Sequence, residues 1–256
     1  MHSRGVVVNC ELRTERISPA LRRSPMHYTS LASELEITLE PAVPATACVV
    51  LLHGLGADGW DFVPIVEELR LPESLPVRWV FPHAPLRPVT VNAGYVMRAW
   101  YDTRSFTPEG RADAAGLAEL VARVGAYLEQ EVARGIAASR IVLAGFSQGG
   151  AVALSAGLRF RERLAGLLAL STYLPFPARL EAEKSAANAD VPILMCHGRM
   201  DPVVPIAMGS EARDVLSAQG YAVEWHEYPM EHEVCAAELA ETAKWLRGVL
   251  APQASG

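Results

Sequence analysis

The stretch Val142-Leu-Ala-Gly-Phe-Ser147-Gln-Gly-Gly-Ala-Val-Ala-Leu154 combines an apolar run, a glycine-rich turn and a helix-forming segment. The apolar run is typical of a buried strand, and the alanine- and leucine-rich segment favours a helix. Between them, Gly145-Phe-Ser-Gln-Gly149 matches the G-x-S-x-G pattern, in which a serine stands on a sharp strand-to-helix turn. Glycines suit such a turn because it brings neighbouring backbones so close that a Cβ would clash. The stretch therefore predicts a strand, a tight turn at Ser147 and a helix.

The helix after Ser147 would direct unpaired backbone N–H groups and the positive end of its dipole toward the serine. This environment suits a negative oxygen formed when the serine attacks a carbonyl group. The same local pattern also fits an ordinary turn in which Ser147 caps the helix. Residues elsewhere in the chain must decide between these interpretations.

The composition is that of an ordinary globular protein, with 256 residues, 50% of them hydrophobic and 20% charged. The net charge is −6 and the 23 basic residues form no run, which argues against nucleic-acid binding. The four cysteines have no C-x-x-C spacing, so neither a disulfide framework nor a metal site is expected. No apolar stretch has the length of a membrane span, and the N-terminal residues lack a signal-peptide pattern. We therefore expect a cytoplasmic protein.

The chain is expected to fold as one α/β domain over residues 31–252, after a loose extension over residues 1–30. Residues 1–30 mix Arg, Ser and Pro without a sustained period, and Met26 is a possible natural start. Apolar runs then alternate with amphipathic segments, which indicates a mostly parallel sheet covered by helices on both faces. The expected strands are Leu35–Leu39, Ala47–Leu52, Val77–Phe81, Ile141–Ala144, Leu164–Leu170, Val191–Cys196 and Ala222–Tyr228. The expected helices besides the one after Ser147 are Phe62–Leu69, Asp113–Arg134, Pro205–Gln219 and Ala236–Leu250.

The segment from Pro82 to about Gly110 shows no regular period and is expected to be irregular. Loops of this length in a compact domain are usually functional or disordered, and the aromatic residues here favour an ordered wall. We predict that Leu86–Phe106 lines a substrate-binding site, with Trp100 and Tyr95 as candidate substrate contacts. The alternative is a structural cluster packed under a long loop.

A serine nucleophile needs a base, and the sheet geometry selects among the histidines. In parallel α/β sheets the ligand site lies beyond the carboxyl ends of the strands. His53 and His197 follow strands, but each precedes a glycine in a tight turn, so they are expected to bond nearby backbone groups. His232 follows the last strand in a loop that can reach the Ser147 turn. We predict that His232 is the general base.

The third member of a triad should hold the histidine in place. Asp201 follows the strand Val191–Cys196 and lies among prolines, at the correct edge of the sheet. The order Ser147, Asp201, His232 is the chain order of α/β-hydrolases. An aspartate before a proline is more commonly a turn residue, and that interpretation stays open for Asp201.

An oxyanion requires two hydrogen-bond donors. The backbone N–H of Gln148, directly after the nucleophile, is one candidate. The second is expected from the glycine-rich turn His53-Gly-Leu-Gly56, where we predict the N–H of Leu55. A glycine-rich turn without a catalytic part is the alternative for this stretch.

Several motifs together resemble the bacterial carboxylesterase and acyl-protein thioesterase family of α/β-hydrolases, over about Leu35 to Leu250. They are His53-Gly-Leu-Gly-Ala-Asp58, Phe81-Pro-His-Ala-Pro85, Ala99-Trp-Tyr-Asp102, Gly145-Phe-Ser-Gln-Gly-Gly150, His197-Gly198 with Asp201, and Tyr228-Pro-Met230 before His232. The resemblance implies an α/β-hydrolase fold with Ser147, Asp201 and His232 as triad and Leu55 and Gln148 as oxyanion donors. It also implies no metal or organic cofactor, and a monomer or homodimer.

The activity that the resemblance implies is hydrolysis of short to medium acyl esters, with a small-molecule acyl ester as substrate. An acyl(-protein) thioesterase or a lysophospholipase-type hydrolase is the alternative within the same class. A non-catalytic ligand-binding protein of the same fold is a remote alternative, because such a protein is expected to have lost a triad member. Two residues depart from the family pattern, Glu231 before His232 and His83 before Ala-Pro.

Overall fold

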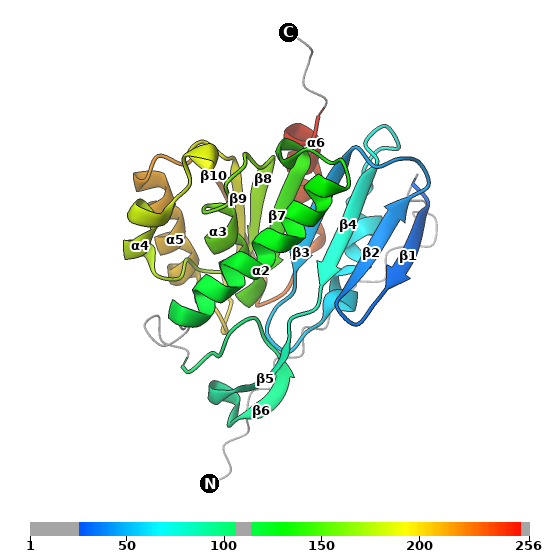
Figure 1. Ribbon diagram of the computed structural model, residues 1–256. Coiled ribbons are helices and arrows are strands. Elements are labelled where there is room, and N and C mark those ends of the chain that lie inside the picture. The colour runs from blue at the N-terminus through cyan, green and yellow to red at the C-terminus, as the bar shows by residue number, and fades with distance from the viewer. Residues whose placement is uncertain (1–25, 106–113, 252–256) are drawn as a thin grey trace.

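The computed structural model describes residues 26–105 and 114–251, which are organised around one eight-stranded sheet (Figure 1). Its strands are β1 (Tyr28–Ala32), β2 (Glu36–Pro41), β3 (Ala47–Leu52), β4 (Val77–Pro82), β7 (Ile141–Phe146), β8 (Gly166–Leu170), β9 (Ile193–Gly198) and β10 (Val223–Tyr228). The spatial order is β1-β2-β4-β3-β7-β8-β9-β10, and every pair from β4 to β10 is parallel. Only β1 and β2 run antiparallel to their neighbours. The predicted α/β class with a mostly parallel sheet is confirmed.

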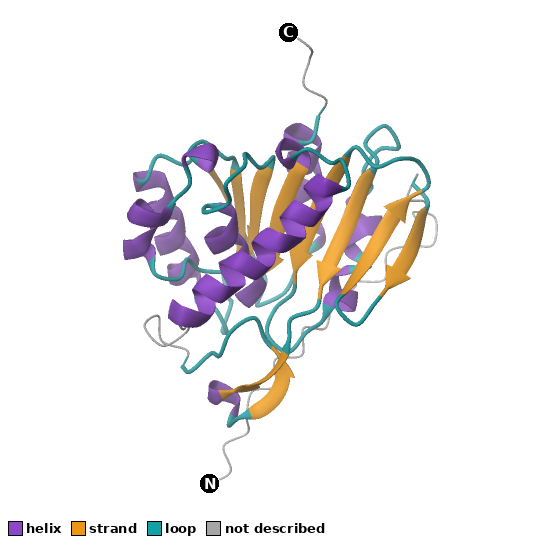
Figure 2. Ribbon diagram, viewed as in Figure 1, coloured by secondary structure: helices purple, strands orange, loops and turns teal. Residues whose placement is uncertain are grey.

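Helices cover both faces of this sheet (Figure 2). They are α1 (Ile65–Leu69), α2 (Ala114–Ala133), α3 (Gln148–Gly157), α4 (Pro177–Glu183), α5 (Ile206–Ala218) and α6 (Ala236–Val249), with short 3₁₀ helices at Gly59–Phe62, Thr90–Asn92, Ala138–Arg140 and Ala186–Asn188. Apolar side chains of α2, α3, α4 and α5 pack on one face, and those of α1 and α6 on the other. No helix among the described residues has the length and apolar character needed to cross a membrane.

The continuous apolar runs in the sequence correspond to strands that are buried at every position. β3 shows how both faces are used: Val50 and Leu52 join the core beside α2 and α3, while Val49 and Leu51 join the core beside α1 and α6. β4, β7, β8 and β9 are likewise buried along their whole length. Because side chains alternate between the faces, a strand covered on both sides needs apolar residues throughout.

The structure differs from the sequence-based expectation in three places. β1 crosses the expected boundary at residue 30, since Tyr28–Ala32 pairs with β2 although most of its side chains are exposed. An edge strand obtains its hydrogen bonds from one neighbour and needs no buried face, so its sequence carries little signal. In place of the helix expected over Phe62–Leu69, the structure has the shorter α1, which begins after Pro64. Residues 1–25 lie outside the described residues.

The third difference is a two-stranded hairpin in the segment that was expected to be irregular. Antiparallel strands β5 (Leu86–Val89) and β6 (Tyr95–Arg98) form it, and its turn contains Ala93 and Gly94 at positive φ. The hairpin follows β4 and projects beyond the carboxyl ends of the parallel strands (Figure 1). The N–H of Gly56 donates to the carbonyl of Arg98 at 2.9 Å, so β6 is tied to the turn after β3.

A buried carboxyl group in α6 makes the stability of the fold depend on pH. Glu238 is completely buried, and this burial raises its pKa to about 8 from the ordinary value of 4.5. Between these values the folded protein holds a proton that the unfolded chain has released, so the free energy of unfolding decreases as pH rises. The loss is about 1.4 kcal/mol per pH unit within this window.

We expect Glu238→Gln to remove this dependence, because the amide keeps the shape and does not ionise. Relative to wild type, the variant should gain stability steadily between pH 5 and pH 8, as measured by urea unfolding. Glu119→Gln, on the exposed side of α2, serves as the control and should leave the pH dependence unchanged. An equal stability difference at pH 5 and pH 8 would contradict the prediction.

Candidate active site

Ser147 lies between β7 and α3 in a strained backbone conformation. Its φ of 54° and ψ of −120° are sparsely populated for a residue with a side chain, at a cost of about 1–3 kcal/mol. A Cβ on Gly145 would lie 2.3 Å from the carbonyl carbon of Gly149, and a Cβ on Gly149 would lie 2.1 Å from the carbonyl oxygen of Leu52. Both glycines are therefore required by close backbone contacts, as the sequence predicts.

Two hydrogen bonds attach the Ser147 turn to β8 and to the loop that follows it. The N–H of Ser147 donates to the carbonyl of Leu170 at 2.9 Å, and the Thr172 hydroxyl donates to the carbonyl of Ser147 at 2.6 Å. Thr172 was not among the predicted site residues. Its position two residues after β8, at the carboxyl edge of the sheet, is the signal that could have identified it.

Asp201 and His232 are in direct contact. The Nδ1 atom of His232 is 2.6 Å from Oδ2 of Asp201, and both side chains are almost fully buried. A carboxylate only accepts hydrogen bonds, so Nδ1 carries the proton and Nε2 is free to act as a base. Oδ1 of Asp201 accepts the N–H groups of Val203 and Val204, each at 2.8 Å. Asp201 therefore both shapes its turn and orients the histidine.

The His232 imidazole lies beside the Ser147 turn. Its ring packs against the ring of Phe146, the residue before the serine, with centroids 4.7 Å apart. The loop of Asp201 is bonded to the loop of His232, because the N–H of Met200 donates to the carbonyl of Met230 at 3.1 Å. The structure thus brings Ser147, Asp201 and His232 together at the carboxyl ends of β7, β9 and β10.

The turn after β3 packs against the same serine. A Cβ on Gly54 would lie 3.5 Å from Cβ of Ser147, which places the neighbouring Leu55 peptide beside the nucleophile. Among the described residues, no hydrogen bond uses the N–H of Leu55. The N–H of Gln148 opens α3 and has no acceptor within the helix. The two predicted oxyanion donors therefore lie on adjacent turns, and both are available to a ligand.

His53 and His197 bond backbone groups, as expected. The N–H of Ala84 donates to Nε2 of His53 at 3.0 Å, so the proton is on Nδ1, which donates to the carbonyl of Gly54 at 2.7 Å. Nε2 of His197 is 2.8 Å from the carbonyl of Val204, beside the Asp201 turn. Burial lowers the pKa of both imidazoles, that of His53 to about 4.

The two candidate substrate contacts, Trp100 and Tyr95, lie in different environments. Trp100 is completely buried, and its indole N–H donates to the carbonyl of His53 at 2.8 Å, so it belongs to the protein interior rather than to an open wall. The burial of Trp100 favours the packed-cluster alternative, and its contact with substrate stays a prediction. Tyr95 is 70% exposed on β6. Phe106, the end of the predicted wall, lies outside the described residues.

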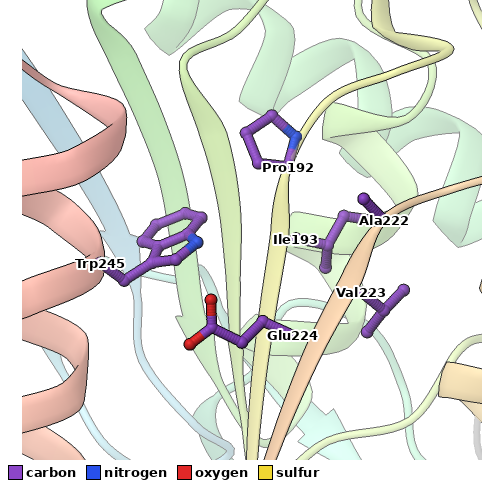
Figure 3. Close-up of a pocket in the computed structure, with 6 residues that line it drawn as sticks. All are labelled: Pro192, Ile193, Ala222, Val223, Glu224 and Trp245. Atoms are coloured by element: carbon purple, nitrogen blue, oxygen red, sulfur yellow. The ribbon is translucent and has the colours of Figure 1, made fainter.

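Two features elsewhere do not take part in this site. A cavity of about 320 Å³ lies at the amino ends of β9 and β10, at the opposite edge of the sheet from Ser147. In this cavity the Glu224 carboxylate is turned toward the Trp245 indole (Figure 3). Within residues 26–105 and 114–251, one group of three side chains has ligand atoms close enough to share an ion: Glu224, His226 and Glu241. Glu224 already pairs with His226, and Glu241 pairs with Lys244.

The protonation of His53 provides a test of the geometry at the turn after β3. We expect His53 to be neutral, with its proton on Nδ1, at every pH above about 4, because burial disfavours the imidazolium. Long-range ¹H–¹⁵N spectra of the histidine rings measure both the tautomer and the titration midpoint, and His53→Gln identifies the signal. A midpoint near the ordinary 6.5, or a proton on Nε2, would contradict the described hydrogen bonds.

The chain is similar to known proteins over most of its length. The sequence profile of the phospholipase/carboxylesterase family matches residues 33–250. An acyl-protein thioesterase 1 from Neurospora crassa is 40% identical over 213 residues, covering 78% of this chain and 86% of that relative. The crystal structure of acyl-protein thioesterase 2 from Zea mays is 30% identical with a TM-score of 0.75, covering 84% of this chain and 98% of that one. The crystal structure of esterase PE8 is 29% identical with a TM-score of 0.71, covering 88% of this chain and 99% of that one.

Proposed function

The chain belongs to the phospholipase/carboxylesterase family of serine hydrolases, and we propose that it cleaves acyl thioesters and esters with Ser147, His232 and Asp201 as its catalytic triad. The observation that carries the proposal is the 2.6 Å contact between Asp201 and His232, held beside the strained Ser147 turn. A strained turn is retained where function requires it.

In the first step, the Ser147 hydroxyl attacks the carbonyl carbon of the acyl group while Nε2 of His232 takes its proton. The electron pair of the C=O bond moves to the oxygen, which becomes an oxyanion. Asp201 keeps the His232 ring oriented and stabilises the imidazolium through Nδ1. Deep burial of the carboxylate strengthens this stabilisation, because less water screens the charge.

The N–H groups of Leu55 and Gln148 are proposed to bind the oxyanion. Loss of one such donor costs about 2.7–4 kcal/mol of transition-state stabilisation in a well-studied serine protease, so this pair is a major part of catalysis. The dipole of α3 adds to the effect, since its positive end faces Ser147.

The intermediate then collapses, and His232 returns its proton to the departing thiol or alcohol. The acyl group is left on Ser147 as an ester. Water then attacks the carbonyl carbon of this acyl-enzyme while His232 takes its proton. Collapse of the second oxyanion breaks the bond to the Ser147 oxygen, which receives the proton from His232, and the carboxylic acid is released.

We place acyl thioesters first among the substrates. Oxygen esters are the first expectation from the sequence, but the Neurospora crassa relative is an acyl-protein thioesterase, and so is the Zea mays protein. A carboxylesterase is the second candidate, favoured by the similarity to esterase PE8. The Ser147 site accommodates both, because the attacked carbonyl is the same and only the departing group differs.

A matched pair of substrates decides between these candidates. We expect kcat/KM for an S-octanoyl cysteine peptide to exceed that for the corresponding O-octanoyl serine peptide by about 100-fold, or roughly 2.7 kcal/mol of differential transition-state stabilisation. A ratio below one would favour the carboxylesterase. Ser147→Ala is the control; it should lose both activities and labelling by a fluorophosphonate. Retained turnover in that variant would exclude the triad.

A further inference from the structure

The two proposed oxyanion donors belong to different parts of the chain. Leu55 follows β3, whereas Gln148 follows β7. Such donors act only when both lie within hydrogen-bond distance of one oxygen atom, about 2.7–3.1 Å away. The separation and orientation of the two peptides must therefore be fixed by contacts around them.

Trp100 contacts both turns at once. Its indole N–H donates to the carbonyl of His53 at 2.8 Å, and its backbone N–H donates to Oε1 of Gln148 at 2.8 Å. The indole also packs on the His53 ring, with centroids 5.3 Å apart. All three residues are buried, so these bonds face no competition from bulk water.

On one side, the contact with His53 reaches the Leu55 donor through a peptide group. Nδ1 of His53 donates to the carbonyl of Gly54, and this carbonyl shares its planar peptide with the N–H of Leu55. A bond to one end of a trans peptide sets the direction of the group at the other end. Trp100 holds the His53 carbonyl, so it stabilises the position from which His53 orients this peptide.

On the other side, the contact with Gln148 restrains the residue that supplies the second donor. Nε2 of Gln148 donates to the carbonyl of Tyr101 at 3.0 Å and to the Thr103 hydroxyl at 3.1 Å. Together with the N–H of Trp100, these bonds occupy both ends of the side-chain amide. The segment from Trp100 to Thr103 is thereby fixed to the first residue of α3.

We propose that Trp100 is a positioning residue for hydrolysis, which connects the two oxyanion-binding turns and sets their separation. This inference rests on the proposed function, since it concerns the same oxyanion site. Trp100 touches no reacting atom, and it acts through His53 and Gln148. Its indole N–H is the part that a phenylalanine cannot replace.

The test compares two buried tryptophans that each donate one indole hydrogen bond. Trp100→Phe removes the bond to His53, and Trp79→Phe removes a bond of 3.3 Å to the Tyr28 hydroxyl, at β4. We expect Trp100→Phe to lower kcat about 10- to 100-fold with little change in KM, because a small misplacement of catalytic groups has effects of this size. Trp79→Phe should keep kcat within about twofold of wild type, while its Tm falls by about as much as the Tm of Trp100→Phe.

A trifluoromethyl ketone gives a second readout of the oxyanion site. In the proposed reaction the Ser147 oxygen bonds to the ketone carbon, its proton moves to His232, and the C=O electron pair leaves an oxyanion. The affinity of Trp100→Phe for the ketone should fall by the same factor as its kcat/KM. Unchanged ketone affinity or unchanged kcat in a folded Trp100→Phe variant would overturn the positioning role.

A third variant covers the case in which Trp100→Phe does not fold. Replacing Trp100 with β-(3-benzothienyl)alanine keeps the bicyclic shape and removes only the N–H. The same losses of kcat and ketone affinity are expected, and wild-type values would overturn the inference. Failure of the proposed function has a different signature, in which wild-type protein forms no ketone adduct and Ser147→Ala remains active.

Discussion

The close packing of the Ser147 turn against the end of β3 is the constraint on which the site depends. β3 and β7 are parallel neighbours, and Gly149 approaches the Leu52 carbonyl so closely that no side chain fits between them. This contact places Gly54, the neighbour of the proposed donor Leu55, beside Ser147. The strain at Ser147 is sustained because β7 and α3, which are both buried along their whole length, fix the two ends of the turn.

The other loops extend this arrangement at the same edge of the sheet. Asp201 follows β9 and His232 follows β10, and hydrogen bonds join their two loops into one unit. On the opposite side, Trp100 and Gln148 connect the β5–β6 hairpin segment to the serine turn. Each proposed catalytic group is therefore held by at least two elements, which gives a site built from loops the positional accuracy that catalysis requires.

Much of this site could be predicted from the sequence because its residues obey a positional rule. Ser147, Asp201 and His232 each follow an apolar run, and the carboxyl ends of parallel strands meet at one edge. The burial of individual side chains and the pairing of the less regular strands were harder to predict. The polar edge strand β1 and the hairpin have no strong period, and an aromatic residue such as Trp100 carries the same sequence signal whether it lines a pocket or fills the interior. The complete burial of Trp100 and its hydrogen bond to His53 separate these roles.

The proposed function depends on a covalent acyl-enzyme, which Ser147 forms with the help of His232 and Asp201. The most direct measurement is mass spectrometry of wild-type protein mixed with an octanoyl thioester and quenched in acid within milliseconds. We expect one octanoyl group per chain, attached to the peptide that contains Ser147, with formation and decay rates that match turnover. Turnover without this adduct, or an octanoyl group on any other residue, would contradict it.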